Sequence, residues 1–289
     1  HEMTGRPYLM RIMGFGLRSP KHRVPGRAVA GTVAAVGANV TRFTVGDEVF
    51  GASRGAFAEY TAAREDKLAR KPSTLTFEQA AAVPISATTA LQGLRLGGIE
   101  AGQKVLIIGA SGGVGTYAVQ LAKAYGTEVT GVCSAAKSDL VRSLGANRTI
   151  DYATEDFADG SRRYDLILDI AGNTSLRRLR RALNPAGSLV IVGGESKGDL
   201  TGGFGRSLRA PLVSLFVRQR LTMLASKEHH ADLMPLTDLI DAGELTPSID
   251  ATYTLAQAQD AMRQLEAGAV RGKVSITMPA PFTAGTSAP

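Results

Sequence analysis

Cysteine is nearly absent from this chain of 289 residues, because Cys133 is the only one. A single cysteine forms no internal disulfide and builds no cysteine-based zinc site. Long apolar runs are also missing, since stretches such as 105–110 and 189–192 fall far short of the roughly 20 residues that span a bilayer. No signal peptide is recognised at the first residues either. These absences predict a protein without membrane spans in a reducing compartment, and we expect the cytoplasm.

Acidic residues are outnumbered, with 26 of them against 33 lysines and arginines, which gives a net charge of +7. A basic surface attracts polyanions such as nucleic acid, an anionic membrane or a phosphorylated cofactor. Aromatic residues, on which single-stranded nucleic acids stack, are missing from the densest basic cluster. We therefore interpret that cluster as a solvated helix face and hold nucleic-acid binding to be the less favoured alternative. Its members are Arg177, Arg178, Arg180 and Arg181.

The first part of the chain carries short β-prone runs separated by glycines. They lie at 28–36, 47–50 and 56–60, and this pattern is typical of a small barrel or sandwich. Hydrophobic residues make up 44% and charged residues 20%, which excludes a disordered or fibrous chain. The length itself predicts about two domains.

A strict alternation of strands and helices begins at residue 104. Its strands are predicted at 104–109, 128–133, 149–152, 164–170 and 188–192, with helices at 113–125, 138–144 and 175–183. Apolar strands with little alternation are covered on both faces, which predicts a parallel sheet between two layers of helices. Further helices are expected at 233–242 and 256–266, and further strands at 248–253 and 273–278.

A glycine-rich turn joins the first of these strands to the helix after it. The turn reads Ala110-Ser111-Gly112-Gly113-Val114-Gly115, an A-x-G-x-x-G variant of the dinucleotide-binding fingerprint. Gly112 allows the backbone to approach a pyrophosphate, and Gly115 allows the helix to pack closely on its strand. Amides at the helix start, together with the helix dipole, then hold the phosphates. The sequence thus predicts a nicotinamide dinucleotide site.

The end of the second strand indicates which dinucleotide is bound. NAD-specific sites carry an acidic residue there for the ribose 2′-hydroxyl. Here Ser134 follows Cys133, and Lys137 lies three residues further on. A hydroxyl and an ammonium favour a 2′-phosphate, so we expect NADPH; the alternative is that Lys137 is an ordinary surface lysine.

Seven short motifs in this order resemble the zinc-independent quinone and enone reductases of the medium-chain dehydrogenase/reductase superfamily. The resemblance extends over nearly the whole chain. The motifs are VPGRAVAG at 24–31, VGDEVFG at 45–51, FAEY at 57–60, AAAVP at 80–84, TALQ at 89–92, the turn at 110–115 and RGKV at 271–274.

This resemblance implies a doubly wound Rossmann sheet, hence the α/β class, together with a partial GroES-like β-barrel substrate domain. The domains expected from it are a partial substrate domain at 1–85, an NADP-binding domain at 86–245, a return to the substrate domain at 246–278 and a disordered tail at 279–289. Relatives carry a longer N-terminal segment with the first strands of the barrel. The chain is therefore expected either to be a fragment or to form an incomplete barrel. Relatives are often dimers or tetramers, and an apolar edge strand at 221–224 leads us to expect a homodimer.

The resemblance also implies roles for individual residues. Contacts to the pyrophosphate are expected from Gly112, Gly113 and Val114, within the cofactor-binding turn that Ala110 and Ser111 begin. Around the 2′-phosphate and adenine, Ser134, Lys137 and Tyr152 are expected, although Tyr152 could equally be a packing residue. The remaining expected cofactor contacts are Thr89, near the nicotinamide, and Gly172 and Gly193, where backbone passes close to the cofactor.

A catalytic zinc ligand is missing from the chain. Zinc-dependent relatives have a Gly-His-Glu motif where this chain has Gly26-Arg27-Ala28, and the four-cysteine lobe is absent, so no metal is expected. The pair His229-His230 cannot easily converge on one ion, and we expect it in a solvent-exposed loop. Without a Lewis acid, a conjugated acceptor is favoured, because an enone or quinone spreads the developing charge. We therefore predict hydride transfer from NADPH to a quinone or an α,β-unsaturated carbonyl compound.

Two residues are candidates for proton donation in that reaction. His1 and Tyr8 lie in a segment that faces the nicotinamide in relatives, and each either donates a proton or only shapes the pocket. Two rival functions stay open as well. One is reduction of another activated alkene, such as an acyl thioester; the other is an NADPH-binding protein with little turnover and some affinity for nucleic acid.

Overall fold

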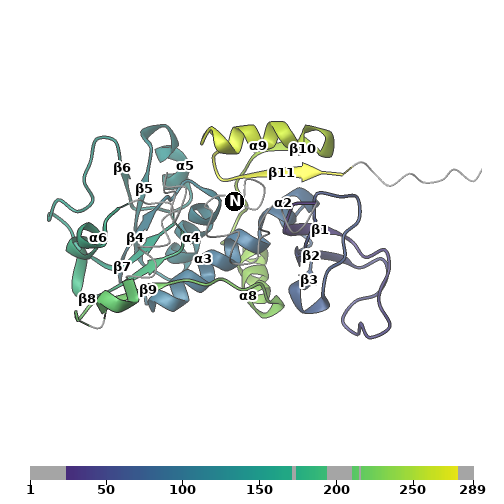
Figure 1. The fold of residues 1–289 in the computed structure, drawn as a ribbon, viewed down its shortest axis with the longest axis horizontal. Helices are drawn as coiled ribbons and strands as arrows, with labels where there is room; N and C mark the ends of the chain where they lie inside the picture. The colour runs from purple at the N-terminus through teal and green to yellow at the C-terminus, as the bar shows by residue number, and fades with distance from the viewer. Residues whose placement is uncertain (1–23, 171–173, 194–209, 215, 279–289) are drawn as a thin grey trace, which may run out of the picture.

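The computed structural model describes residues 24–170, 174–193, 210–214 and 216–278, and the largest sheet among them is parallel and six-stranded (Figure 1). The strand order is β6-β5-β4-β7-β8-β9, which is the doubly wound Rossmann order, with the reversal between β4 and β7. The predicted fold class is therefore confirmed. The strands are β4 (Lys104–Ile108), β5 (Glu128–Cys133), β6 (Arg148–Asp151), β7 (Tyr164–Asp169), β8 (Leu183–Ile191) and β9 (Arg220–Met223).

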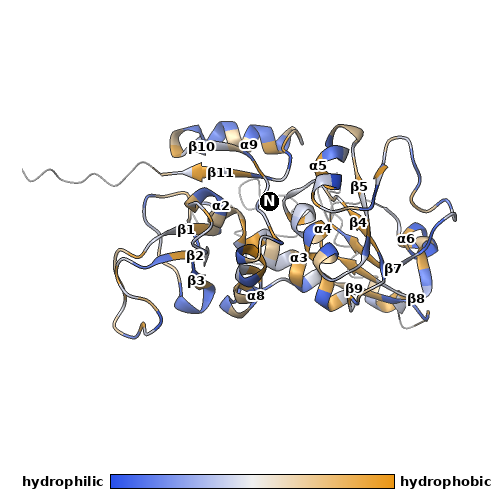
Figure 2. Ribbon diagram, turned by 180° about the vertical axis from the view of Figure 1, so that it is seen from behind, coloured by the Kyte–Doolittle hydropathy of each residue, from blue (hydrophilic) through white to orange (hydrophobic). Residues whose placement is uncertain are grey.

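Both faces of this sheet are buried, as the apolar strands predict. Along β4, Val105 and Ile107 belong to one hydrophobic cluster, and Leu106 and Ile108 belong to the other. Figure 2 shows these strands predominantly in the hydrophobic colour. Helices α3 (Pro84–Gly97), α4 (Gly113–Ala124), α5 (Ser138–Ser143) and α8 (His230–Asp241) contribute to the first cluster, and α6 (Leu176–Ala182) contributes to the second.

Two buried tyrosine hydroxyls in the core, those of Tyr117 and Tyr164, have no hydrogen-bond partner among the described residues. Tyr117 on α4 is fully buried, and its hydroxyl makes no hydrogen bond with any residue that the structure describes. Burial also raises the pKa of Tyr117 above its ordinary value, because the phenolate would be desolvated.

Replacing Tyr117 with phenylalanine is therefore expected to stabilise the protein by up to about 1 kcal/mol, since an unsatisfied polar group is removed while the ring is kept. Urea unfolding of both proteins measures this difference. A marked loss of stability would show that the hydroxyl has a partner after all.

A three-stranded antiparallel sheet is separated from the large one by α3, which contacts both (Figure 1). It consists of β1 (Ala28–Thr32), β2 (Glu48–Ala52) and β3 (Leu68–Arg70), in that order. The first two strands were predicted, although β1 ends earlier than expected, while β3 was not foreseen. The strand predicted at 56–60 is wrong. The amides of Ala56 and Phe57 bond to the carbonyls of Gly26 and Pro25, but no strand ladder follows.

The segment from β10 to β11 contacts both α2 and the glycine-rich turn. Strands β10 (Ile249–Thr254) and β11 (Lys273–Thr277) pair in parallel, and α9 (Ala258–Glu266) connects them. The Ser275 hydroxyl of β11 donates to the carbonyl of Glu78 in α2 (Phe77–Ala82), 3.3 Å away. Just before β11, Gly272 forms a parallel bridge with Gly112. The segment that leads into β11 therefore lies against the glycine-rich turn.

Candidate cofactor-binding site

The glycine-rich turn lies at the carboxyl ends of the central strands, where the strand order of the large sheet reverses. In open α/β sheets this crevice is where ligands bind. The amides of Gly109 and Ala110 both donate to the carbonyl of Val132 on β5, at 3.1 and 3.0 Å. Gly109 has a φ of +88°, which a residue with a side chain rarely adopts. The turn is thus held rigidly against the neighbouring strand.

Two glycines of the turn differ in what surrounds them. A Cβ on Gly115 would lie 2.1 Å from the Gly109 carbonyl oxygen, so this position admits no side chain. Among the described residues, a Cβ on Gly112 would meet only that same oxygen, at 3.5 Å. Packing within the protein therefore requires Gly115, whereas the space beside Gly112 is open to a ligand.

In the described part of the chain, the amides of the first turn of α4 face this space without a hydrogen-bond partner. The first helical bond runs from the Thr116 amide to the Gly112 carbonyl, at 2.9 Å. The amides before it have no partner within a helix, and no side chain caps them. No acidic residue stands in the first turn to neutralise the positive end of the helix dipole. The residues here fit an anionic pyrophosphate.

The lysine that begins β11, Lys273, lies beside the first turn of α4. Lys273 donates through Nζ to the Ser86 hydroxyl at 3.1 Å, and its Cδ lies 2.8 Å from the position of a Cβ on Gly113. No ion pair links Lys273 to a carboxylate among the described residues. Desolvation lowers the pKa of this ammonium below its ordinary value. The RGKV motif was noted in the sequence, but nothing there indicated this contact.

The residues expected at the 2′-phosphate are brought together at the end of β5. Ser134 precedes the short helical turn that contains Lys137, and the Tyr152 amide donates to the Cys133 carbonyl at 3.2 Å. The Tyr152 ring is 68% exposed, so it is not a core packing residue. The Lys137 ammonium donates to the carbonyls of Gly268 and Val270, both at 2.7 Å.

The carboxylate of Asp151, next to these residues, accepts hydrogen bonds from its own turn. Asp151 ends β6 beside Cys133, and its oxygens accept bonds from the Ala153 amide at 3.1 Å and the Thr154 hydroxyl at 3.3 Å. Burial raises the pKa of the Cys133 thiol, which keeps it protonated and poorly nucleophilic.

The other expected site residues lie in several places. Thr89 on α3 bonds through its hydroxyl to the Ile85 carbonyl at 2.7 Å and lies 3.3 Å from the Ser226 hydroxyl. Gly193 follows β8, and a Cβ there would lie 2.8 Å from the Ile170 carbonyl oxygen. His1, Tyr8 and Gly172 lie outside the described residues.

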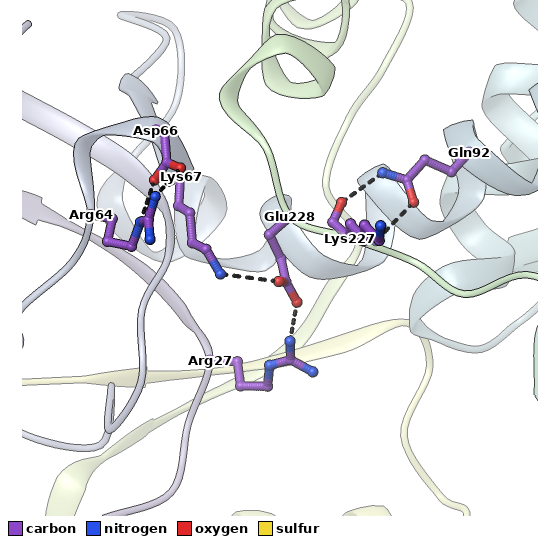
Figure 3. A network of polar contacts seen from close by, with 7 residues as sticks. All are labelled: Arg27, Arg64, Asp66, Lys67, Gln92, Lys227 and Glu228. Carbon is purple, nitrogen blue, oxygen red and sulfur yellow. Dashed lines mark hydrogen bonds and ion pairs between the residues drawn. The ribbon is translucent and has the colours of Figure 1, made fainter.

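A polar network joins the small sheet to the segment between β9 and α8 (Figure 3). Glu228 of that segment forms ion pairs with Arg27 and with Lys67, the latter at 3.5 Å. Next to it, Gln92 of α3 donates to the Lys227 carbonyl at 2.7 Å and accepts from the Lys227 amide at 3.2 Å. Arg27, which stands where zinc-dependent relatives have the histidine, is therefore paired with a carboxylate.

Replacing Glu228 with glutamine is expected to lower the free energy of unfolding by about 1 kcal/mol, because two cations lose one partly buried partner. Thermal unfolding measures this, and Glu59→Gln, at an exposed glutamate, is the matched control. Equal melting temperatures for the two variants would mean that the network contributes no stability.

The histidine pair is engaged in local contacts. The rings of His229 and His230 lie 4.4 Å apart; His229 caps α8, and Nδ1 of His230 lies 3.3 Å from the Asp66 carbonyl oxygen. Within the described part of the chain, no three His, Cys, Asp or Glu side chains gather closely enough to hold a metal ion.

Fold and turn together define a protein of the Rossmann dinucleotide-binding class. Comparison with known proteins gives the family. The Alcohol dehydrogenase GroES-like domain matches residues 6–73, and the Zinc-binding dehydrogenase family matches residues 144–276. The chain belongs to the medium-chain dehydrogenase/reductase superfamily, in its quinone oxidoreductase branch.

Three similar proteins illustrate the relationship. A tomato 2-methylene-furan-3-one reductase is 33% identical over 89% of this chain and 64% of its own length. A mouse mitochondrial NAD(P)H oxidoreductase is 33% identical over 88% of this chain and 70% of its own length. The quinone oxidoreductase of Coxiella burnetii superposes with a TM-score of 0.78, at 30% identity, over 87% of this chain and 78% of that one. The chain thus spans less than two thirds of the tomato relative.

The names of these relatives describe oxidoreductases, and that of the mouse protein includes NAD(P)H. No helix in the described ranges is both long enough and apolar enough to cross a bilayer.

Proposed function

We propose that this protein binds NADPH and transfers hydride from it to a quinone or an α,β-unsaturated carbonyl compound, without zinc. The observation that carries this proposal is the glycine-rich turn, with its free helix amides, at the switch point of a Rossmann sheet. The names of the relatives support the same reaction class.

The amides of Gly113 and Val114 bind the pyrophosphate in this proposal, and Gly112 leaves room for it. Ala110 and Ser111 shape the turn. The Lys273 ammonium adds a positive charge beside the first turn of α4. At the other end of the cofactor, Thr89, Gly172 and Gly193 border the nicotinamide.

Preference for NADPH over NADH rests on the end of β5. Ser134, Lys137 and Tyr152 offer a hydroxyl, an ammonium and an exposed ring there. Asp151, which pairs with Cys133 across the two strands, is bonded within its own turn. A 2′-phosphate therefore meets a positive charge rather than a negative one.

Bound NADPH supplies a hydride, and the acceptor takes it at carbon. The conjugated system of a quinone or enone spreads the resulting negative charge, and one proton completes the two-electron reduction. The protein orients the acceptor and keeps the cleft dry. Arg27, in place of a zinc-ligating histidine, supports a reaction that needs no metal. His1 and Tyr8 are the proposed proton donors or pocket-shaping residues.

Calorimetric titration with NADPH and NADH tests the cofactor, and steady-state assays with quinones, enones and simple alcohols test the reaction. We expect tighter binding of NADPH and turnover of conjugated acceptors that survives a chelator. Alcohol oxidation that requires added zinc would refute the proposal. A larger turnover with unsaturated acyl thioesters would favour that rival substrate class.

A second candidate function is cofactor binding with little turnover, together with nucleic-acid affinity. One observation favours it: the four clustered arginines line a hollow of about 830 Å³ together with Arg163 and Arg218. Yet Arg178 and Arg181 pair with Asp156, which weakens the case. Steeply salt-dependent RNA binding without turnover of any acceptor would establish this alternative.

We also propose that the protein is a cytoplasmic homodimer. Strand β9 is an edge of the large sheet among the described residues. Its Leu221 amide donates to the Ser214 hydroxyl at 3.0 Å, and in this proposal the rest of the edge pairs with a second copy. Sedimentation analysis gives the mass, and a monomer at all concentrations would refute the dimer. The mouse relative is named as mitochondrial, so fractionation of the source cells has to decide the compartment.

A further inference from the structure

A short segment connects α9 to β11 and runs between two parts of the proposed cofactor site. We name residues 268–273 the strap. At one end it contacts Lys137, and at the other it contacts the turn at Ser111 and Gly112. It therefore links the proposed 2′-phosphate end of the site to its pyrophosphate end.

Lys137 holds the first half of the strap. Its ammonium donates to two strap carbonyls, those of Gly268 and Val270, each at 2.7 Å. Bonds from a charged donor are stronger than neutral ones. No ion pair links Lys137 to a carboxylate among the described residues, so its positive charge is not neutralised there. An ammonium has three donors, and a third one is left for another acceptor.

The second half of the strap is fixed against the turn. The Gly272 amide donates to the Ser111 carbonyl at 3.0 Å, and the Lys273 amide donates to the Ser248 carbonyl at 2.9 Å. Gly272 has a φ of +87°, and a Cβ there would lie 2.5 Å from the Ser248 carbonyl oxygen. The strap thus has one defined path, and that path carries the Lys273 side chain to Ser86 and Gly113.

We propose that Lys137 is a positioning residue for the whole cofactor site. By tying down the strap, it holds Gly272 against Ser111 and Lys273 beside the pyrophosphate position, in addition to offering a donor to a 2′-phosphate. This inference rests on the proposed cofactor, and it separates two roles of one lysine. A direct ligand of the 2′-phosphate affects only nucleotides that carry that group. A positioning residue also affects nucleotides without it, because an ordered strap lowers the entropy cost of binding.

The test uses Lys137→Met, which keeps the length of the side chain and removes its donors. Lys104→Met is the matched control, since that exposed lysine lies at the amino end of β4, whereas the glycine-rich turn follows the carboxyl end of the same strand. Calorimetry compares ADP-ribose with its 2′-phosphorylated form, so that no turnover is needed. Hydrogen exchange of the ligand-free protein reports on the strap amides. If Lys137→Met does not fold, Lys137→Gln replaces it in both measurements.

We expect Lys137→Met to weaken the 2′-phosphorylated nucleotide about a hundredfold and unphosphorylated ADP-ribose about fivefold, with Lys104→Met unchanged. Without ligand, exchange at Arg271, Gly272 and Lys273 should accelerate about tenfold. Unchanged ADP-ribose affinity with unchanged exchange would overturn the inference and leave Lys137 as a 2′-phosphate ligand alone. If the unmodified protein bound neither nucleotide, the proposed function would fail, while the exchange rates would still show whether Lys137 orders the strap.

Discussion

Replacing Gly112 with alanine is expected to leave the protein folded and to weaken nicotinamide dinucleotide binding about a hundredfold, which corresponds to about 3 kcal/mol. The backbone at Gly112 has a φ of −85°, which any residue adopts, and the new methyl group would meet only the Gly109 oxygen at 3.5 Å. The methyl group would, however, occupy space that the pyrophosphate needs. Calorimetric titration with NADPH, together with urea unfolding, measures both effects.

The contrasting control is alanine at Gly115. Its Cβ would lie 2.1 Å from the Gly109 oxygen and 2.7 Å from Ala110, so the turn or the helix has to move. We expect this variant to lose more than about 3 kcal/mol of stability, because the clash is with backbone. If Gly112→Ala bound NADPH normally, the turn would not be the phosphate site, and the proposed function would lose its main support.

Replacing Lys273 with methionine is expected to change stability and binding in opposite directions. Without cofactor, the ammonium is desolvated and unpaired with any described carboxylate, so an apolar side chain of similar length should stabilise the protein by about 1 kcal/mol. With cofactor, the same charge faces the pyrophosphate, and its loss should weaken NADPH binding at least about tenfold. Lys104→Met serves as the control here as well.

The pH dependence of stability gives an independent check on Lys273. Its folded-state pKa lies below the ordinary value of 10.5, so between these two values the unfolded chain binds more protons than the folded one. The free energy of unfolding from this group therefore rises as the pH increases through that window. Lys273→Met should lack this rise, while the control should keep it. Urea unfolding from pH 7 to pH 10 measures the free energy of unfolding of both variants. If it changed with pH in the same way for Lys273→Met and Lys104→Met, the desolvation assigned to Lys273 would be contradicted.

Periodicity predicted the large sheet well because each strand is buried on both faces. The strand at 128–133 was predicted with the bounds that β5 has, and α4 ends one residue before the predicted helix. The small sheet was predicted less well. Its strands are short, and β3 has only three residues, too few for an alternating pattern to be recognised. The run at 56–60 has strand composition but makes only two amide bonds to the segment before β1.

The candidate site divides in the same way. The sequence predicted the glycine-rich turn because the strand, the glycines and the helix follow one another directly in the chain. The sequence could not predict the contacts of Lys273 and Lys137, since the partners of both lysines are distant in sequence. Ser86 precedes Lys273 by 187 residues. The carbonyls that accept from Lys137 follow it by 131 and 133 residues, after α9.

By itself, the sequence determined the fold class, the location of the phosphate turn and the absence of an acidic residue at the end of β5. These features depend on neighbouring residues, whose spacing sets backbone geometry and burial. Only the tertiary structure decided that Gly112 borders space left open by the described residues while Gly115 does not, and that β11 brings a lysine to the turn. Such contacts depend on how segments distant in sequence pack together. The free-energy contribution of an unpaired charge, or of a glycine that lacks a side chain, is set by the groups that surround it in space.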